Sequence, residues 1–417
     1  MPSTTLSARL RSGTRAEHER LGEQPFFLAL ESGELGRERF VGYLRAMAAV
    51  HYTLDRVLAD THSEALRQLA GESWLPGLCH DIAALETMPA TFGVPASLSM
   101  TKDILARAER EPLSLIGYRY TFEGSTLGMP ELRRWVVTCL GLEDSTQLRH
   151  LNRYGDLAPA RWRSFRAQLD ALELSDEQRD QALEGARAAF DQVAAIAGDL
   201  MWRHEAPLLN SSAINPEGGT YPIIQDPLLL EAAIVAGDQV YERWPYFAAR
   251  YADRGRAFAH SDGAWLALTV DLTPERMHKQ IDWLANVLAG RGIPAYLLEE
   301  HLRCEYGVII EANPLEQPRF APMLAAADRL RAKRLEALDA DTGERLLAEF
   351  SAQVEGQDPL RLGLIMLELV RDQLGDRPKA VESLLEWASV ERVGVDCSTA
   401  LRRLAAVAVK AGRSPTS

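Results

Sequence analysis

The stretch "RERFVGYLRAMAAVHYTLDRVLAD", residues 37–60, decides the fold class. Its apolar side chains recur at spacings of three and four residues, which is the period of an amphipathic α-helix. The same period runs through residues 177–204 and 274–292. Two-residue alternation is scarce. The one segment that could pass for a strand, residues 263–272, lies among helices and is apolar on both faces. We therefore predict an all-α protein.

The length of the chain indicates two domains. It has 417 residues, and a chain of this length exceeds what one hydrophobic core ordinarily organises. The hydrophobic fraction of 47% is sufficient to form a large apolar interior. Loop-forming residues gather in "APLLNSSAINPEGGTYPIIQDP", residues 206–227, which contains Ser-Ser, Asn-Pro and Gly-Gly pairs. We predict a first domain at 1–206, a linker at 207–225 and a second α-helical domain at 226–417.

Charge and composition exclude several classes of function. The formal net charge of −13 disfavours nucleic-acid binding, because polyphosphate repels an acidic surface. No apolar run is long enough to cross a bilayer, and the opening residues lack the apolar core of a signal peptide. The four cysteines are widely spaced and form no CxxC pair, which argues against a zinc site or a disulfide framework. We expect a cytoplasmic protein that binds neither nucleic acid nor membrane.

A histidine lies in the first helical stretch, in step with a row of apolar residues. Leu6, Leu10, Thr14 and His18 follow at intervals of four, so they share one helix face and His18 is expected to point inward. One interpretation is a core histidine bonded to a carbonyl or carboxylate. The other is the axial ligand of a heme iron. Arg11, two turns earlier and about 10 Å away along a straight helix, could neutralise a carboxylate of such a ligand or be a solvated surface side chain.

A pair of glycines marks a second informative stretch, "IGYRYTFEGSTLGMPELRRWV", residues 116–136. Tyr120, Gly124 and Gly128 are spaced four and four, which places them on one helix face. Each glycine inside a helix costs about 1 kcal/mol relative to alanine, so the pair needs a reason. Either two helices pack closely there, or a flat ligand lies on the bare backbone of a helix that bends at its glycines.

These two stretches, in this order, resemble the heme oxygenase family. The first helix carries a T-x-x-x-H motif, Thr14 to His18, with Arg11 seven positions before the histidine. The later stretch is similar to the "YxxEGSxLG" pattern of the bacterial, biliverdin-producing branch. The residues that match this pattern are Tyr120, Glu123, Gly124, Ser125, Leu127 and Gly128. The resemblance covers roughly residues 5–205.

The resemblance implies a role for each matched residue. His18 would ligate the iron of a heme that is both cofactor and substrate. The catalytic residues would be Gly124, Ser125 and Gly128; the other heme contacts would be Arg11, Tyr120, Glu123, Met129, Arg163 and Arg166. Ser125 stands where animal and cyanobacterial enzymes carry an aspartate, and Met129 stands where the family prefers glycine or alanine. Ser125 implies that the waters around bound oxygen are anchored differently, and Met129 bears on which ring position is cleaved.

The resemblance also implies a reaction and its partners. Heme and O2 would yield biliverdin, carbon monoxide and ferrous iron. The sequence shows no FAD or NAD fingerprint, so the electrons would come from an external donor such as a ferredoxin or a flavin reductase.

Two other functions remain open on this scaffold. One is a heme- or bilin-binding protein that has lost turnover. The other is a non-heme di-iron oxidase, for which the available ligands would be His51, His80, Glu123 and His204. In the second half, His301 and Glu305 are four apart but too few to define a metal site. That half is expected to be an accessory domain for homodimer formation, for docking a partner or for holding the bilin product.

Overall fold

The computed structural model describes residues 5–87, 90, 93–143, 148–202, 208–375, 377 and 379–413. In these ranges the regular secondary structure is helical, with one isolated β-bridge between Asn210 and Pro222, which confirms the all-α prediction. None of the described helices has the length and apolar character needed to span a bilayer.

The chain forms two compact units. Unit 1 comprises Met1–Leu209 and Gln225–Glu231, and unit 2 comprises Asn210–Ile224 and Ala232–Ser417. The segment predicted as a linker, 207–225, is divided between them, and its first residue lies outside the described ranges.

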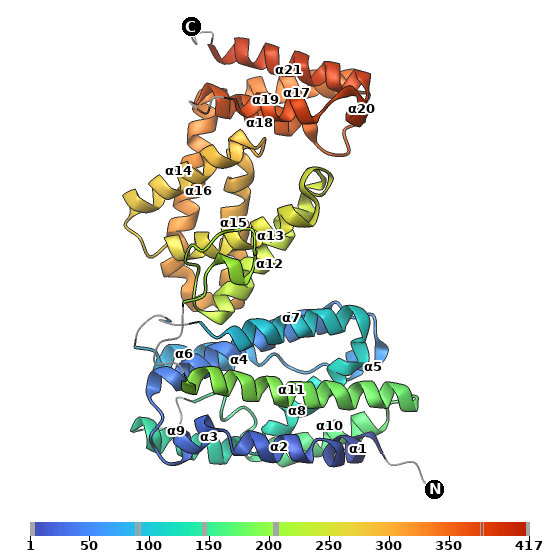
Figure 1. The fold of residues 1–417 in the computed structure, drawn as a ribbon, viewed down its shortest axis with the longest axis vertical. Coiled ribbons are helices and arrows are strands. Elements are labelled where there is room, and N and C mark those ends of the chain that lie inside the picture. The colour runs from blue at the N-terminus through green and yellow to red at the C-terminus, as the bar shows by residue number, and fades with distance from the viewer. Residues whose placement is uncertain are drawn as a thin grey trace. The chain divides into compact units, whose positions relative to one another are not determined.

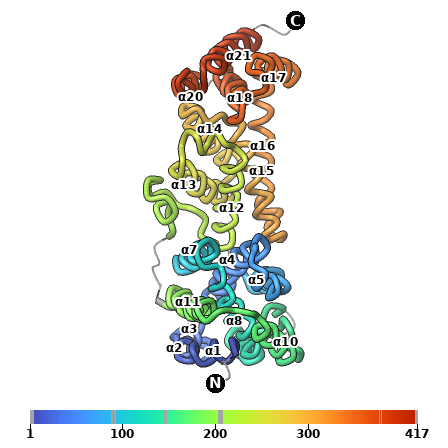
Figure 2. The backbone as a smooth tube through the Cα atoms, turned by 90° about the vertical axis from the view of Figure 1, so that its right-hand side faces the viewer, coloured from blue at the N-terminus to red at the C-terminus, as the bar shows by residue number. Residues whose placement is uncertain are grey.

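Unit 1 is organised around its longest helix, α11. In chain order its helices are α1 (Leu6–Gly13), α2 (Arg15–Gly22), α3 (Pro25–Glu31), α4 (Arg37–Ala59), α5 (Glu64–Gln68), α6 (Leu75–Leu85), α7 (Pro95–Arg110), η1 (Pro112–Ser114), α8 (Leu115–Ser125), α9 (Met129–Leu140), η3 (Gly155–Leu157), α10 (Ala158–Asp170) and α11 (Asp176–Trp202). α11 packs against α4, α7 and α8 and also against α1, α2 and α3. Figures 1 and 2 show it between α4 and α7 above and α1, α2 and α3 below. The two stretches singled out in the sequence therefore share one packing partner.

The crossing of α8 and α11 depends on two glycines. A Cβ on Gly185 would lie 1.8 Å from the carbonyl oxygen of Ser114, and a Cβ on Gly117 would lie 2.1 Å from the carbonyl oxygen of Ala182. No side chain fits at such distances, so the two backbones are in direct contact. This contact fixes α8, and with it the Gly124 segment, on the central helix.

Helix α12 (Pro227–Arg243) begins after an N-cap aspartate, Asp226. Asp226 accepts hydrogen bonds from the backbone N–H groups of Leu228 and Leu229, at 2.8 and 3.1 Å, and Pro227 follows it at the first helical position. Arg45 Nε lies 3.1 Å from the same carboxylate, so the start of α12 is tied to α4 within unit 1.

The remaining helices belong to unit 2. They are η4 (Ser211–Ala213), α13 (Pro245–Thr269), α14 (Pro274–Gly290), α15 (Ala295–Ala312), η5 (Pro314–Glu316), α16 (Gln317–Ala337), α17 (Ala340–Gln353), α18 (Leu362–Leu374), α19 (Ala380–Trp387), α20 (Val390–Val393) and α21 (Val395–Arg413). α15 and α16 form a helical hairpin, and α18 packs against α17, α19 and α21. Residues 263–272, which could pass for a strand in the sequence, are largely the end of α13.

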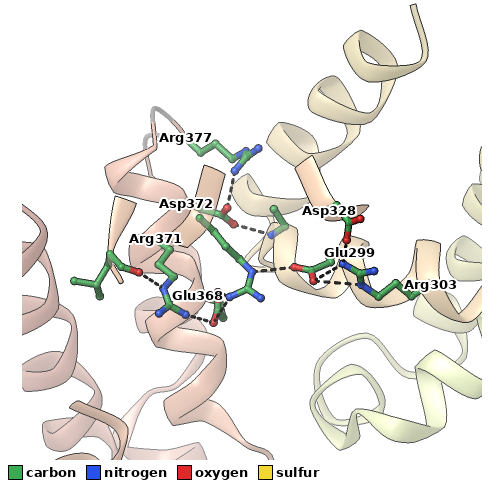
Figure 3. A network of polar contacts seen from close by, with 10 residues as sticks. Glu299, Arg303, Asp328, Glu368, Arg371, Asp372 and Arg377 are labelled. Atoms are coloured by element: carbon green, nitrogen blue, oxygen red, sulfur yellow. Dashed lines mark hydrogen bonds and ion pairs between the residues drawn. The ribbon is translucent and has the colours of Figure 1, made fainter. Parts of the chain in front are cut away.

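A buried network of charges joins α15, α16 and α18 (Figure 3). The Arg334 guanidinium lies 2.9 Å from Glu299 and 3.2 Å from Glu368, and Arg371 lies 2.6 Å from Glu368. Asp372 accepts from the backbone N–H of Ala295 at 2.8 Å. Because every one of these buried charges has a partner of opposite sign or a backbone donor, the network orients the three helices without leaving a charge uncompensated.

Candidate functional site

The first helical stretch is two helices with a break at Thr14. Thr14 has φ −114° and ψ 9°, and its hydroxyl donates to the carbonyl oxygen of Leu10 at 2.8 Å, a bond that bends helices. Gly13 lies tightly against α11, since a Cβ there would be 2.6 Å from the Leu183 side chain. The estimate of 10 Å between Arg11 and His18 assumed one straight helix, so it does not apply.

His18 does not point inward, which corrects the expectation from the sequence. Leu6, Leu10 and Thr14 are buried, but the row ends at the break, and the His18 side chain is exposed. Its ring meets the ring of Phe190 on α11 edge to face, with centroids 5.8 Å apart. In the part of the chain that the structure describes, its ring nitrogens make no hydrogen bond, so the imidazole is available to a ligand.

Tyr120 is the point where three helices converge. Its side chain on α8 is buried, and burial raises the pKa of its phenol, while a hydrogen bond with Thr14 and the charges of Arg11 and Arg166 oppose that rise. The structure therefore brings together Tyr120, Arg11 and Arg166, which the sequence placed in one site from positions far apart in the chain.

The arginines of this site lack carboxylate partners. Arg11, Arg163 and Arg166 are exposed, and none of them forms an ion pair with any residue in the described ranges. Other arginines of α1 and α2 are paired. Those pairs are Arg9 with Asp180, Arg15 with Glu19 at 2.8 Å, and Arg20 with Asp191 at 3.3 Å. An acidic protein that leaves these cations uncompensated offers them to an anionic ligand.

The glycine stretch interrupts its helix. α8 ends at Ser125 and α9 begins at Met129; between them, backbone bonds from Leu127 to Gly124 and from Gly128 to Ser125 span three residues, as in a 3₁₀ turn. A Cβ on Gly128 would meet only the Ser125 carbonyl oxygen, at 3.6 Å, so the space beside Gly128 is open. The neighbouring Met129 is buried, with 6% of its surface exposed.

Gly124 is not bare, in contrast to the expectation from the sequence. A Cβ there would contact the indole ring of Trp162, from α10, at 3.4–3.9 Å. Trp162 also packs against Tyr120, with ring centroids 5.4 Å apart, and stacks on Phe165 at 5.9 Å. The indole therefore covers the face of α8 on which a flat ligand was expected.

Ser125 and Glu123 have partners of their own. The Ser125 hydroxyl donates to the Phe122 carbonyl oxygen at 2.7 Å, which leaves its lone pairs facing solvent as acceptors. Glu123 is buried, 2.9 Å from Arg119, and accepts from the Tyr154 hydroxyl at 3.3 Å. The structure thus places Glu123 in a buried ion pair within α8, and its role as a heme contact stays a prediction.

Two residues of this region were not singled out in the sequence. Trp162 precedes Arg166 by four positions, which places both on one face of α10, and this spacing was a usable signal. Phe190 is one aromatic residue in the long α11 and had no sequence signal that connects it to His18.

The residues considered for a di-iron site do not assemble one. His51 stacks on Trp74, with centroids 4.9 Å apart and rings nearly parallel, and burial lowers its pKa well below the usual value. His80 lies beside Asp81, and His204 is outside the described residues. In unit 2, His301 lies 3.4 Å from Glu305. Within the described ranges, no three side chains of the ligating types gather closely enough to hold a metal ion.

Comparisons with known proteins match the N-terminal half. The family model for heme oxygenase matches residues 4–197. The chain is 27% identical over 206 residues to heme oxygenase PigA of Pseudomonas aeruginosa, which covers 47% of this chain and 91% of that relative. Among solved structures, heme oxygenase-2 from Synechocystis sp. PCC 6803, in complex with heme and NO, is 20% identical with a TM-score of 0.44, covering 47% of this chain and 85% of that one. Heme oxygenase from Leptospira interrogans is 19% identical with a TM-score of 0.41, covering 46% and 98%.

Proposed function

We propose that the N-terminal half of this chain, which is similar to heme oxygenases over residues 4–197, binds heme and cleaves it to biliverdin, carbon monoxide and ferrous iron. The observation that carries the proposal is that Arg11 and Arg166, which have no ion-pair partner among the described residues, act on Tyr120 in the same unit that presents the exposed imidazole of His18. An imidazole is a common ligand of heme iron, and cations bind the two heme propionates. The donor set at this site has both.

In this proposal some residues bind the heme iron and others orient the heme ring. His18 would hold the heme iron, since an imidazole is the ligand type found in globins and peroxidases. Arg11, Arg163 and Arg166 would bind the propionates and so orient the ring relative to the glycine stretch. Bound heme supplies an iron that binds and activates O2. Its electrons come from an external donor such as a ferredoxin or a flavin reductase.

The glycine stretch supplies the distal surface. The open space beside Gly128 admits a flat ligand against the backbone, whereas the indole of Trp162 must leave Gly124 before a ring can lie there. Since the Ser125 hydroxyl donates to the Phe122 carbonyl, its lone pairs would accept a hydrogen bond from a water beside the glycine stretch. A cytoplasmic location and a homodimer stay predictions of the sequence.

The test uses the full chain, reconstituted with hemin and then given reductant and O2. We expect a 1:1 complex with a sharp Soret band, followed by conversion of that band to bilin absorption with release of carbon monoxide. Product identification by mass spectrometry completes the assignment. The absence of a saturable 1:1 complex would overturn the proposal.

A pair of glycine variants localises the binding. Gly128 and Gly198 both have negative φ, and both have open space where a Cβ would lie. Gly128→Leu should weaken heme binding at least tenfold by filling the distal space, while Gly198→Leu, on the far part of α11, should leave binding unchanged. Equal effects of the two variants would place heme elsewhere.

A second function is favoured by the Trp162 indole, which covers Gly124. Because the indole occupies the face of α8 on which the ring would react, a heme- or bilin-binding protein without catalysis is the alternative. A Soret band that persists under reductant and O2 assigns the protein to this class.

A further inference from the structure

Unit 2 contains a cavity of about 260 Å³ between α12, α13, α14 and α15. Its walls are apolar and aromatic, with Tyr241, Phe247, Tyr251 and Phe258 among aliphatic side chains such as Leu266. Pockets that hold drug-sized ligands measure about 300–1,000 Å³, so this one suits a short chain or a small ring system and is too small for a tetrapyrrole.

The cavity lies at a break in α13. Ala252 has φ 47° and ψ −151°, a conformation that favours glycine and is strained for alanine. The Tyr241 hydroxyl donates to the carbonyl oxygen of Ala252 at 2.5 Å and holds the break in place. This strained segment carries Tyr251 and Arg254 onto the cavity wall. Strain of this kind, maintained by the surrounding structure, is concentrated at ligand sites.

Charged groups are distributed unevenly over the cavity. Arg254 and Arg291 line it and are both exposed, and both guanidinium groups lie over the Phe258 ring, at 5.5 and 6.0 Å from its centroid. Arg254 is paired with Glu217 at 2.7 Å. Arg291 has no ion pair with any residue that the structure describes. A cation on the solvent side of an apolar cavity is positioned to bind the anionic end of a ligand.

The inner wall carries a carboxyl group instead. Asp262 accepts from the Tyr221 hydroxyl at 3.2 Å, and burial raises the pKa of Asp262 to about 6. His301, on the same wall, is buried and lies 3.4 Å from Glu305. Above pH 6 the Asp262 carboxyl group is ionised and repels an anion from this wall, so an anionic ligand enters with its apolar end first.

We propose that this cavity binds a small amphipathic carboxylate, with its apolar chain or ring among the aromatic side chains and its carboxylate on Arg291. The four aromatic rings supply the contact area, and Asp262 sets the direction of entry. This site lies outside the matched region of the chain and does not depend on heme binding.

The experiment is calorimetric titration of the full chain with decanoate. We expect one saturable site, with affinity falling about fourfold for each methylene removed on going to octanoate, which is the contribution of a buried methylene. Decylamine, which has the same chain length and the opposite charge, should bind at least tenfold more weakly than decanoate. The absence of saturable decanoate binding, or equal binding of the amine, would overturn the proposal.

Variants test whether decanoate binds in this cavity or at arginines elsewhere on the protein, such as those of unit 1. Arg291→Met should weaken decanoate binding about three- to fivefold, as expected for an exposed ion pair, whereas Arg276→Met, at an exposed arginine outside the cavity, should have no effect. Ala259→Trp, which fills the cavity, should abolish binding, and Ala259→Leu should weaken it if the tryptophan variant does not fold. Binding that survives in a folded cavity-filled variant would refute the assignment.

Discussion

Replacing Glu123 with glutamine should destabilise unit 1 by about 3 kcal/mol. Glu123 and Arg119 are 2.9 Å apart, four residues apart on α8, and their side chains are 8% and 3% exposed. Removing one partner of a buried pair costs about 3–5 kcal/mol, because the other charge is left uncompensated. The glutamine oxygen recovers about 1 kcal/mol as a neutral hydrogen-bond acceptor. For a unit of this size the loss lowers the unfolding temperature by about 10 °C.

The assay is calorimetric unfolding of the full chain, with hydrogen exchange of α8 peptides to localise the effect. Glu131→Gln is the matched control. Glu131 also pairs with an arginine on its own helix, Arg134 at 3.4 Å, but both side chains are exposed, so its loss should cost less than about 0.5 kcal/mol. Equal stability of the two variants, together with weaker heme binding in Glu123→Gln alone, would refute the structural role of Glu123 and restore it as a ligand contact.

Three further predictions follow from the same geometry. Arg11→Ala should change the ratio of biliverdin isomers while lowering heme affinity less than about fivefold, because the exposed guanidinium orients the propionates more than it holds them; an unchanged isomer ratio contradicts this. Gly185→Ala should cost about 3 kcal/mol or more in unfolding free energy through its clash with the Ser114 carbonyl, whereas Gly198→Ala, with open space at its Cβ, should be neutral or stabilising. The raised pKa of Asp262, about 6, means that the folded chain holds this proton more tightly than the unfolded chain does. Its stabilising contribution is therefore complete below the ordinary value of 3.8 and is lost as the pH rises through 6, and Asp262→Asn should remove that part of the pH profile of unfolding.

The all-α fold could be predicted from the sequence because helical periodicity is a local signal. The three- and four-residue spacing in residues 37–60 and 177–204 corresponds to the long helices α4 and α11, although α4 is buried all round over residues 44–54. The contact between Gly185 and Ser114 could not be predicted, since it depends on which two helices cross and where. That pairing is set by the tertiary fold and leaves no local pattern.

The sequence indicated which residues of the candidate site to consider, but it did not predict their contacts or their burial. Arg11, Tyr120 and Arg166, which the resemblance assigned to one site, lie close enough for both arginines to lower the pKa of Tyr120. His18 was expected to be buried because helical spacing assumes a straight helix, and the Thr14 hydroxyl bond ends that straight run. The partners of Gly124 and Glu123, namely Trp162 and Arg119, are side-chain contacts that spacing does not specify.

The heme-ligand assignment of His18 is tested most directly by the Soret spectrum of hemin added to His18→Ala, compared with His62→Ala. Both histidines are exposed residues of unit 1, but His62 lies outside the candidate site. We predict that His18→Ala loses the sharp Soret band and regains it with added imidazole, while His62→Ala retains the spectrum of the unaltered protein. A sharp, unshifted band in His18→Ala would contradict the proposed site.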